Sequence, residues 1–148
     1  MGARSATVTT ILILDDNPVV LQMLGVLLRG TGGYRVLEAD SEQEAVVQLE
    51  RYGEEVDLLV ADVCIEDRQG RAIANRLTAV SPRLRVLFIS GYPKDHLVES
   101  GWLEQDDAFL AKPFPPARLM HSVNAILEGQ AQAPRSVAAR AACAGGAA

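Results

Sequence analysis

The chain has 148 residues, a hydrophobic content of 49% and a formal net charge of −5 at pH 7, which fits a single globular domain with its own core. The acidic balance argues against a direct nucleic-acid partner, because a protein that binds phosphate backbones needs a basic face. The lack of a signal peptide, and of any apolar run of roughly 18 residues, predicts a cytoplasmic protein with no membrane partner.

The first strand and helix are predicted near the N-terminus. Residues 9–14 (TTILIL) are β-branched and aliphatic, as strands favour. Asn17 is a favourable helix N-cap and Pro18 suits the first helical position, so a helix is expected from Pro18 to about Arg29. Three glycines follow and are expected to end this helix: Gly30, Gly32 and Gly33.

The second strand–helix pair follows directly. Residues 34–39 (YRVLEA) predict a second strand. Ser41, followed three residues later by Glu44, forms a capping-box pattern. This pattern predicts a helix from Ser41 to about Tyr52.

A buried central strand is predicted over residues 57–63 (DLLVADV). Its nearly continuous apolar sequence is typical of a parallel strand covered by helices on both faces. A polar loop is expected from Cys64 to Gln69, closed by Gly70. The next helix should end at the Ser81-Pro82 pair, because the residue before a proline disfavours helical backbone.

Two further strand–helix pairs complete the pattern. Residues 85–89 (RVLFI) and 108–111 (AFLA) predict the fourth and fifth strands. A short helix is expected from Asp95 to Leu103. The last helix should run from Pro115 or Pro116 to Leu127.

The alternation of elements predicts the fold class. Five strand–helix pairs with short connections specify an α/β fold with a doubly wound, five-stranded parallel sheet. We expect this domain to span residues 9–128, after a disordered N-terminus at residues 1–8. Residues 129–148 are rich in Ala and Gly and predict a flexible tail. Cys64 and Cys143 lie far apart, so neither a zinc site nor a disulfide framework is indicated.

Charged and hydroxyl side chains follow four of the five predicted strands. They are Asp15 and Asp16 after the first strand, Asp62 in the third, Ser90 after the fourth and Lys112 after the fifth. A doubly wound sheet brings all these strand ends to one crevice. Three crowded carboxylates repel one another unless a cation lies among them, and hard oxygen ligands suit Mg²⁺. With a lysine and a serine beside them, the set indicates phosphoryl transfer onto a carboxylate.

The pattern of Asp15-Asp16, Asp62, Ser90 and Lys112-Pro113-Phe114 resembles the receiver domain of two-component response regulators over residues 10–128. The turn that begins at Ser90 and the motif that begins at Lys112 are most similar to receivers of hybrid sensor kinases and their stand-alone relatives. The resemblance implies a (βα)5 flavodoxin-like receiver fold and a role in a two-component phosphorelay.

The resemblance assigns the acidic residues to phosphoryl transfer. It makes Asp62 the phosphoacceptor, with a sensor histidine kinase or a histidine phosphotransfer protein as the partner that supplies the phosphoryl group. Asp16 and Asp62 would bind Mg²⁺ directly, Asp15 would act through water, and the main-chain carbonyl of Cys64 would complete the set. Such a domain is not an enzyme, since it catalyses only its own phosphoryl transfer and slow loss of the group.

The resemblance also gives roles to residues after the fourth strand. Ser90 and Lys112 would hold the phosphoryl oxygens, and the peptide bond between Lys112 and Pro113 would be cis, which only an X-Pro bond reaches cheaply. Phe109 falls at the switch aromatic, where tyrosine is commoner, and it fits plain core packing equally well. A partner or a second copy, forming a homodimer, would bind through the fourth helix, fifth strand and fifth helix.

Two side chains flank the path of water toward a phosphoryl group on Asp62. Tyr92 is bulky enough to shield one side, whereas Cys64 is too small to orient water. Both are therefore expected to tune the lifetime of the phosphoryl group. The loop over residues 65–69 also lacks the proline that is usual in the family, which predicts a looser conformation.

Three other functions stay open. A phosphatase of the haloacid dehalogenase type also uses a strand-end Asp with Mg²⁺, but it needs a second Asp where this chain has Cys64. A degenerate receiver that only binds a partner is opposed by the complete set of five site residues. Redox sensing by Cys64 would need an activated thiolate, for which the sequence carries no signal.

Overall fold

The computed structural model describes residues 9–52, 55–65 and 68–129. The predicted disordered N-terminus (residues 1–8) and nearly all of the predicted tail (residues 130–148) lie outside the described residues. In chain order the strands and helices are β1 (Thr10–Leu14), α2 (Pro18–Gly32), β2 (Arg35–Ala39), α3 (Glu42–Tyr52), β3 (Val56–Asp62), β4 (Cys64–Ile65), β5 (Arg68–Gln69), α4 (Gly70–Val80), β6 (Arg85–Ser90), α5 (Lys94–Glu99), β7 (Phe109–Ala111) and α6 (Pro116–Leu127).

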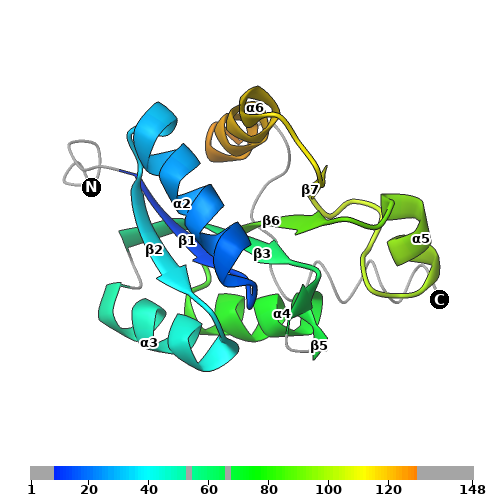
Figure 1. Cartoon of the computed structure of the whole chain (residues 1–148). Coiled ribbons are helices and arrows are strands. Elements are labelled where there is room, and N and C mark those ends of the chain that lie inside the picture. The colour runs from blue at the N-terminus through cyan, green and yellow to red at the C-terminus, as the bar shows by residue number, and fades with distance from the viewer. Residues whose placement is uncertain (1–8, 53–54, 66–67, 130–148) are drawn as a thin grey trace.

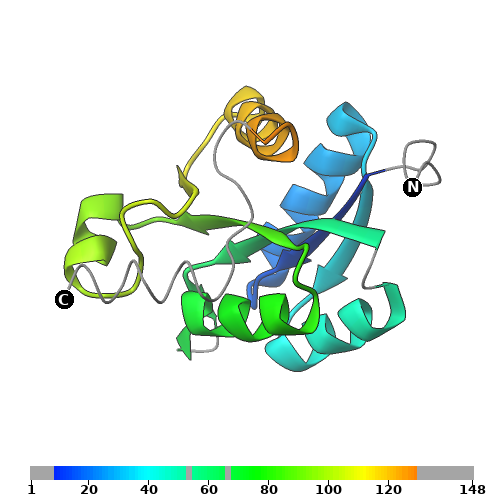
Figure 2. The ribbon, with the colours of Figure 1, turned by 180° about the vertical axis from the view of Figure 1, so that it is seen from behind.

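Five strands form one parallel sheet in the order β2-β1-β3-β6-β7. Helices α2 and α6 pack on one face of this sheet, and α3, α4 and α5 pack on the other (Figures 1 and 2). The predicted doubly wound, five-stranded α/β fold is therefore confirmed. Within the described part of the chain, the helices are too short or too polar to cross a bilayer.

The inner strands are buried on both faces, which explains their continuous apolar sequences. In β1, Ile11 and Ile13 join the core under α2 and α6, whereas Leu12 and Leu14 join the core on the opposite face. All four side chains are fully buried, and the alternation follows from strand geometry. Burial of each such side chain contributes about 1.5–3 kcal/mol to the stability of the fold. The sheet therefore holds the groups at its strand ends in fixed positions.

Helix α2 begins where the sequence predicts and ends later. Oδ1 of Asn17 accepts the N–H of Val19 at 2.9 Å, and Pro18 takes the first helical position. The prediction that the helix ends near Arg29 is wrong, because it continues through Gly30 to Gly32. Gly33 ends it, since only this glycine adopts the left-handed backbone (φ 67°) of a helix C-cap.

The predicted capping box at the start of α3 is formed, except that Glu44 accepts the N–H of Asp40 and not that of the cap residue Ser41. The N–H of Glu44 donates to Oγ of Ser41 at 3.2 Å, while Oε1 of Glu44 accepts the N–H of Asp40 at 3.1 Å. Arg76 of α4 then makes two hydrogen bonds to the Glu42 carboxylate, at 2.6 and 2.9 Å. This contact ties α3 to α4 on one face of the sheet.

Two predicted segments differ from the structure. The expected polar loop from Cys64 to Gln69 contains an antiparallel pairing of β4 with β5 instead. Helix α5 stops at Glu99, well before Leu103, because Gly101 adopts a φ of 82°. The N–H groups of Trp102 and Leu103 then both donate to the Leu97 carbonyl, which closes the turn.

Candidate functional site

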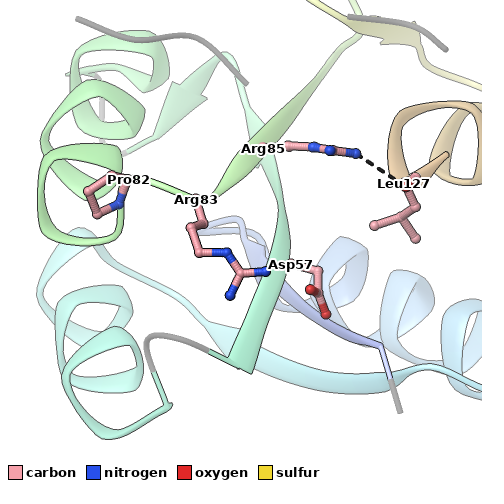
Figure 3. Close-up of a pocket in the computed structure, with 5 residues that line it drawn as sticks. All are labelled: Asp57, Pro82, Arg83, Arg85 and Leu127. Carbon is pink, nitrogen blue, oxygen red and sulfur yellow. Dashed lines mark hydrogen bonds between the residues drawn. The ribbon is translucent and has the colours of Figure 1, made fainter. Parts of the chain in front are cut away.

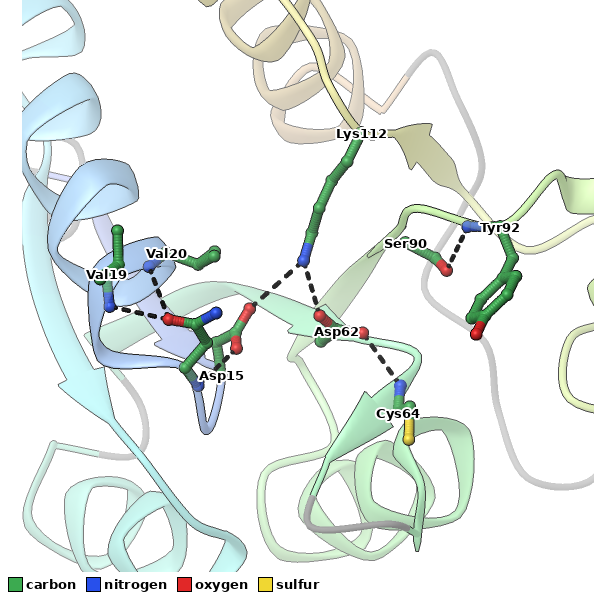
Figure 4. Close-up of polar contacts among 9 residues, drawn as sticks. Asp15, Val19, Val20, Asp62, Cys64, Ser90, Tyr92 and Lys112 are labelled. Atoms are coloured by element: carbon green, nitrogen blue, oxygen red, sulfur yellow. Dashed lines mark hydrogen bonds and ion pairs between the residues drawn. The ribbon is translucent and has the colours of Figure 1, made fainter.

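The carboxyl ends of four parallel strands bring the predicted site residues together. The strand order places β1 beside β3 and β6 between β3 and β7, so Asp15, Asp62, Ser90 and Lys112 line one edge of the sheet. This edge includes the point between β1 and β3 where the chain reverses its winding direction, which is where open α/β sheets bind ligands. Figure 4 shows Lys112 reaching across this edge toward both carboxylates.

Lys112 is the cation that holds the acidic residues together. Its Nζ lies 2.8 Å from Oδ2 of Asp62 and 3.8 Å from Oδ2 of Asp15. The main-chain N–H of Lys112 donates to the main-chain carbonyl of Ser90 at 2.8 Å, which aligns the end of β7 with the end of β6. The Lys112–Pro113 peptide bond is cis, as the resemblance implied.

Asp15 is a buried acid with one unsatisfied oxygen. Its side chain is 1% exposed, and Oδ1 accepts the N–H of Asn17 at 2.8 Å. Oδ2 has no hydrogen-bond partner among the described atoms and faces Lys112 at the longer distance given above. Burial, and to a lesser degree the nearby Asp62 charge, raises the pKa of Asp15 from 3.8 to about 6, against the opposing effects of the Asn17 hydrogen bond and the Lys112 charge.

The oxygen ligands at this strand edge are of the kind that a hard cation prefers, but the side chains alone do not surround a metal position. Asp16 follows Asp15 at an exposed position. Within residues 9–52, 55–65 and 68–129, no three His, Cys, Asp or Glu side chains are gathered closely enough to hold a metal ion by themselves. Mg²⁺ is commonly bound through one or two carboxylates and several waters. The unsatisfied oxygen of Asp15 and the carboxylate of Asp62 are the groups here that could hold such an ion, with water supplying the remaining ligands.

Asp62 is presented at the end of β3 by its own main chain. Oδ1 of Asp62 accepts the N–H of Cys64 at 3.0 Å, while Oδ2 contacts Lys112. The side chain is 15% exposed, so it is mostly buried but still partly accessible to solvent. A glycine is required at position 70, for a reason that the sequence pattern does not reveal: a Cβ there would lie 2.0 Å from the main-chain oxygen of Asp62.

The segment after Asp62 is paired where a loose loop was expected. Cys64 pairs with Gln69, and Ile65 pairs with Arg68, in the antiparallel β4–β5 ribbon. Ile65 is fully buried, whereas Cys64 is exposed. Main-chain pairing and one buried side chain hold the described part of this segment, and the looser conformation expected from the missing proline stays a prediction.

Ser90 and Tyr92 form a small turn beside the site. Ser90 is 4% exposed, and its Oγ accepts the N–H of Tyr92 at 3.0 Å. Tyr92 is 62% exposed, and its ring centroid lies 6.0 Å from that of His96. In Figure 4 the tyrosine ring lies beyond Ser90, on the side away from Lys112. Its predicted shielding of a phosphoryl group on Asp62 stays a prediction.

Phe109 is half-buried in β7 and packs against the core on the α3, α4 and α5 side of the sheet. It lies opposite Phe88 of β6 in the sheet register. Lacking a hydroxyl, Phe109 contributes only packing in this arrangement. Its predicted role as a switch residue stays a prediction.

A separate hollow lies at the opposite end of the sheet, near the start of β3 and β6. Its volume is about 420 Å³, and its lining residues are Asp57, Pro82, Arg83, Arg85 and Leu127 (Figure 3). Arg85 donates to the Leu127 carbonyl at 3.2 Å, and Asp57 accepts the N–H of Thr10 at 3.0 Å. These contacts cap the end of α6 and the start of β1, which is a structural role.

Comparisons with known proteins agree with this geometry. A family profile described as the response regulator receiver domain matches residues 11–124. The sensor kinase CckA of Brucella abortus is 34% identical over 121 residues, which cover 82% of this chain and 13% of that protein. The transcriptional activator protein ExaE of Pseudomonas putida is 32% identical over 134 residues, which cover 90% of this chain and 62% of that protein.

Solved structures agree as well. The crystal structure of a putative response regulator from Chloroflexus aurantiacus has a TM-score of 0.67 and 31% identity, over 82% of this chain and 99% of that chain. The chain thus spans less than two thirds of the two curated relatives and nearly all of this solved structure. The fold, the strand-end site and the profile match lead to one conclusion: the chain belongs to the response regulator receiver domain family of two-component systems.

Proposed function

We propose that this domain accepts a phosphoryl group on Asp62 from a phosphohistidine of a sensor histidine kinase or a histidine phosphotransfer protein. The observation that supports this most directly is the convergence of Asp15, Asp62 and Lys112 at one strand edge, with Lys112 Nζ 2.8 Å from Asp62. Ser90 lies on the neighbouring strand end. A partly open carboxylate beside a cation and a hydroxyl suits attack on phosphorus.

The chemical step needs little from the domain beyond positioning. One oxygen of the Asp62 carboxylate attacks phosphorus, and a P–O bond forms as the P–N bond to the imidazole breaks. The imidazole nitrogen keeps the electron pair of the broken bond. The ammonium group of Lys112 can then leave the Asp62 carboxylate and pair with a phosphoryl oxygen. The Ser90 hydroxyl accepts the N–H of Tyr92, so its own proton remains available to donate to the phosphoryl group.

Mg²⁺ is the cofactor that this donor set would hold. Asp15, Asp16 and Asp62, with the main-chain carbonyl of Cys64, are the groups that would bind it directly or through water. When bound, the ion supplies positive charge that offsets the carboxylates and the incoming phosphoryl group.

We expect the same contacts to carry the effect of phosphorylation to α5, β7 and α6, where a partner would bind. Because the Lys112 N–H donates to the Ser90 carbonyl, drawing either side chain inward biases the packing of β7 and α5. We expect a partner protein, or a second copy of the chain, to bind this face in the cytoplasm when Asp62 is phosphorylated. Beryllofluoride-induced chemical-shift changes confined to residues 41–52 would contradict this.

The experiment is labelling with acetyl phosphate and Mg²⁺, followed by intact-mass measurement. Wild type should gain one phosphoryl group, and Asp62→Asn should gain none. Asp57→Asn is a matched control, because Asp57 lies on the same strand at the opposite end of the sheet. Full labelling of Asp62→Asn would show that another residue is the acceptor.

A phosphatase of the haloacid dehalogenase type is not favoured. That reaction needs a general acid two residues after the nucleophile, and here the position is Cys64. The family match is also to receiver domains. We therefore propose a signalling switch rather than an enzyme that acts on separate substrates.

A further inference from the structure

A buried ion pair joins the phosphoacceptor end of the sheet to the segment that leads into β7. Arg71, the second residue of α4, donates from Nε to Oδ2 of Asp107 at 2.8 Å, and its Nη2 lies 3.1 Å from Oε1 of Glu104. The side chains of Arg71 and Asp107 are 15% and 5% exposed. The pair bridges 36 residues of sequence, so it couples two separate segments.

On the α4 side, the residue before Arg71 packs against the main chain of the phosphoacceptor. The N–H of Gly70 donates to the Val63 carbonyl at 2.5 Å. Gly70 also packs so closely on the main chain of Asp62 that a Cβ would overlap the Asp62 oxygen at 2.0 Å. Arg71 is the next residue. Any displacement of the Asp62 main chain therefore acts on the Arg71 main chain.

On the other side, residues 104–107 form a turn that is held from two directions. Oδ2 of Asp107 accepts the N–H of Glu104 at 2.9 Å in addition to the arginine. Lys94 of α5 donates from Nζ to the carbonyls of Gln105 and Asp107, at 2.7 and 3.0 Å. Strand β7 begins two residues after Asp107. This turn therefore connects α4, α5 and β7.

We propose that the ion pair between Arg71 and Asp107 is a latch that stabilises the unphosphorylated arrangement of residues 104–107 and β7, an inference that rests on the proposed function. The pair is made here while Lys112 contacts Asp62 directly. Loss of Lys112 from this contact to a phosphoryl oxygen would pull on β7 and on the turn before it.

The low exposure of the latch makes it sensitive to contact geometry. A buried ion pair is favourable only with good contact geometry, because desolvation opposes the attraction between the charges. The contact between Arg71 and Asp107 should therefore lose most of its stabilising effect once the two groups are pulled apart. An element with two such arrangements, biased by an event at another site, is what coupling requires.

The test is calorimetric binding of beryllofluoride, a phosphoryl mimic, at saturating Mg²⁺. Asp107→Asn removes the charge and keeps the shape, and it should tighten beryllofluoride binding about fivefold or more, the lower end of typical coupling between sites. Its affinity for Mg²⁺ alone should not change. Arg76→Met is the matched control, because Arg76 makes its ion pair from the same helix to Glu42 of α3, and it should leave both affinities unaltered.

A second variant keeps the test decisive if Asp107→Asn does not fold. Glu104→Gln weakens the same guanidinium contact at a more exposed carboxylate, and it should tighten binding in the same direction by a smaller factor. Equal or weaker beryllofluoride binding by the folded variants, with wild type binding normally, overturns the latch and leaves the proposed function standing. A wild type that binds no beryllofluoride overturns the proposed function and the latch with it.

Discussion

The buried carboxylate of Asp15 should destabilise the metal-free domain, and Asp15→Asn should relieve that cost. Because the pKa of Asp15 is raised from 3.8 to about 6, its ionised form costs the native state about 3 kcal/mol at neutral pH, at about 1.4 kcal/mol per pKa unit. The native state binds this proton more tightly than the unfolded chain, so the free energy of unfolding falls as pH rises between 3.8 and about 6. Asp15→Asn has no carboxylate at this position, so its free energy of unfolding should not fall in this way.

Urea unfolding with EDTA, followed by circular dichroism at pH 4.5 and 7.5, measures the effect. Asp15→Asn should exceed wild type by about 2–3 kcal/mol at pH 7.5 and by much less at pH 4.5. Asp16→Asn, which removes the same charge at an exposed position, is the matched control and should show a smaller difference. Saturating Mg²⁺ should narrow the gap, because it stabilises the native wild type by mass action. A difference that does not depend on pH would refute the reasoning.

Three further outcomes are expected. Asp16→Ala should weaken Mg²⁺ binding, measured by calorimetry, while circular dichroism shows an intact fold. Tyr92→Ala and Cys64→Asn should each speed loss of the phosphoryl group in a mass-spectrometric time course with little change in the labelling rate. The first would remove steric cover and the second would add a water-orienting amide, so lifetimes equal to wild type would count against both roles. Gly70→Ala should lower the free energy of unfolding by about 2 kcal/mol or more in urea, because its Cβ would overlap a main-chain oxygen at 2.0 Å.

The fold could be predicted wherever one local rule decides the structure. The apolar sequence of β3 requires burial on both faces, and Asn17 with Pro18 fixes the start of α2. Helix ends are harder to predict, because a glycine ends a helix only where the chain turns to positive φ. Gly33 does so, and Gly30 does not. The short α5 depends likewise on the backbone at Gly101.

The convergence of the strand-end side chains could be predicted from the sequence, but the pKa values and ion pairs among them could not. Strand ends and parallel pairing are enough to bring Asp15, Asp62 and Lys112 to one edge. The raised pKa of Asp15 depends on how completely the surrounding chain excludes water, which no sequence motif encodes. The contact between Arg71 and Asp107 was missed for a similar reason, because it joins α4 to the segment before β7 across 36 residues.

The position of Lys112 links the resting and phosphorylated forms of the proposed function. Asp15, Asp16 and Asp62 with one lysine give the strand edge a net charge of about −2, which resists an incoming phosphoryl group. A divalent cation held there, as proposed, would bring that charge near zero and would weaken the attraction that holds Lys112 at 2.8 Å from Asp62. Lys112 then becomes available to the phosphoryl oxygens. Because its main-chain N–H donates to the Ser90 carbonyl, a movement of Lys112 would also act on β6. In the proposed function, the group that neutralises the phosphoryl charge would therefore also pass its arrival to the rest of the sheet.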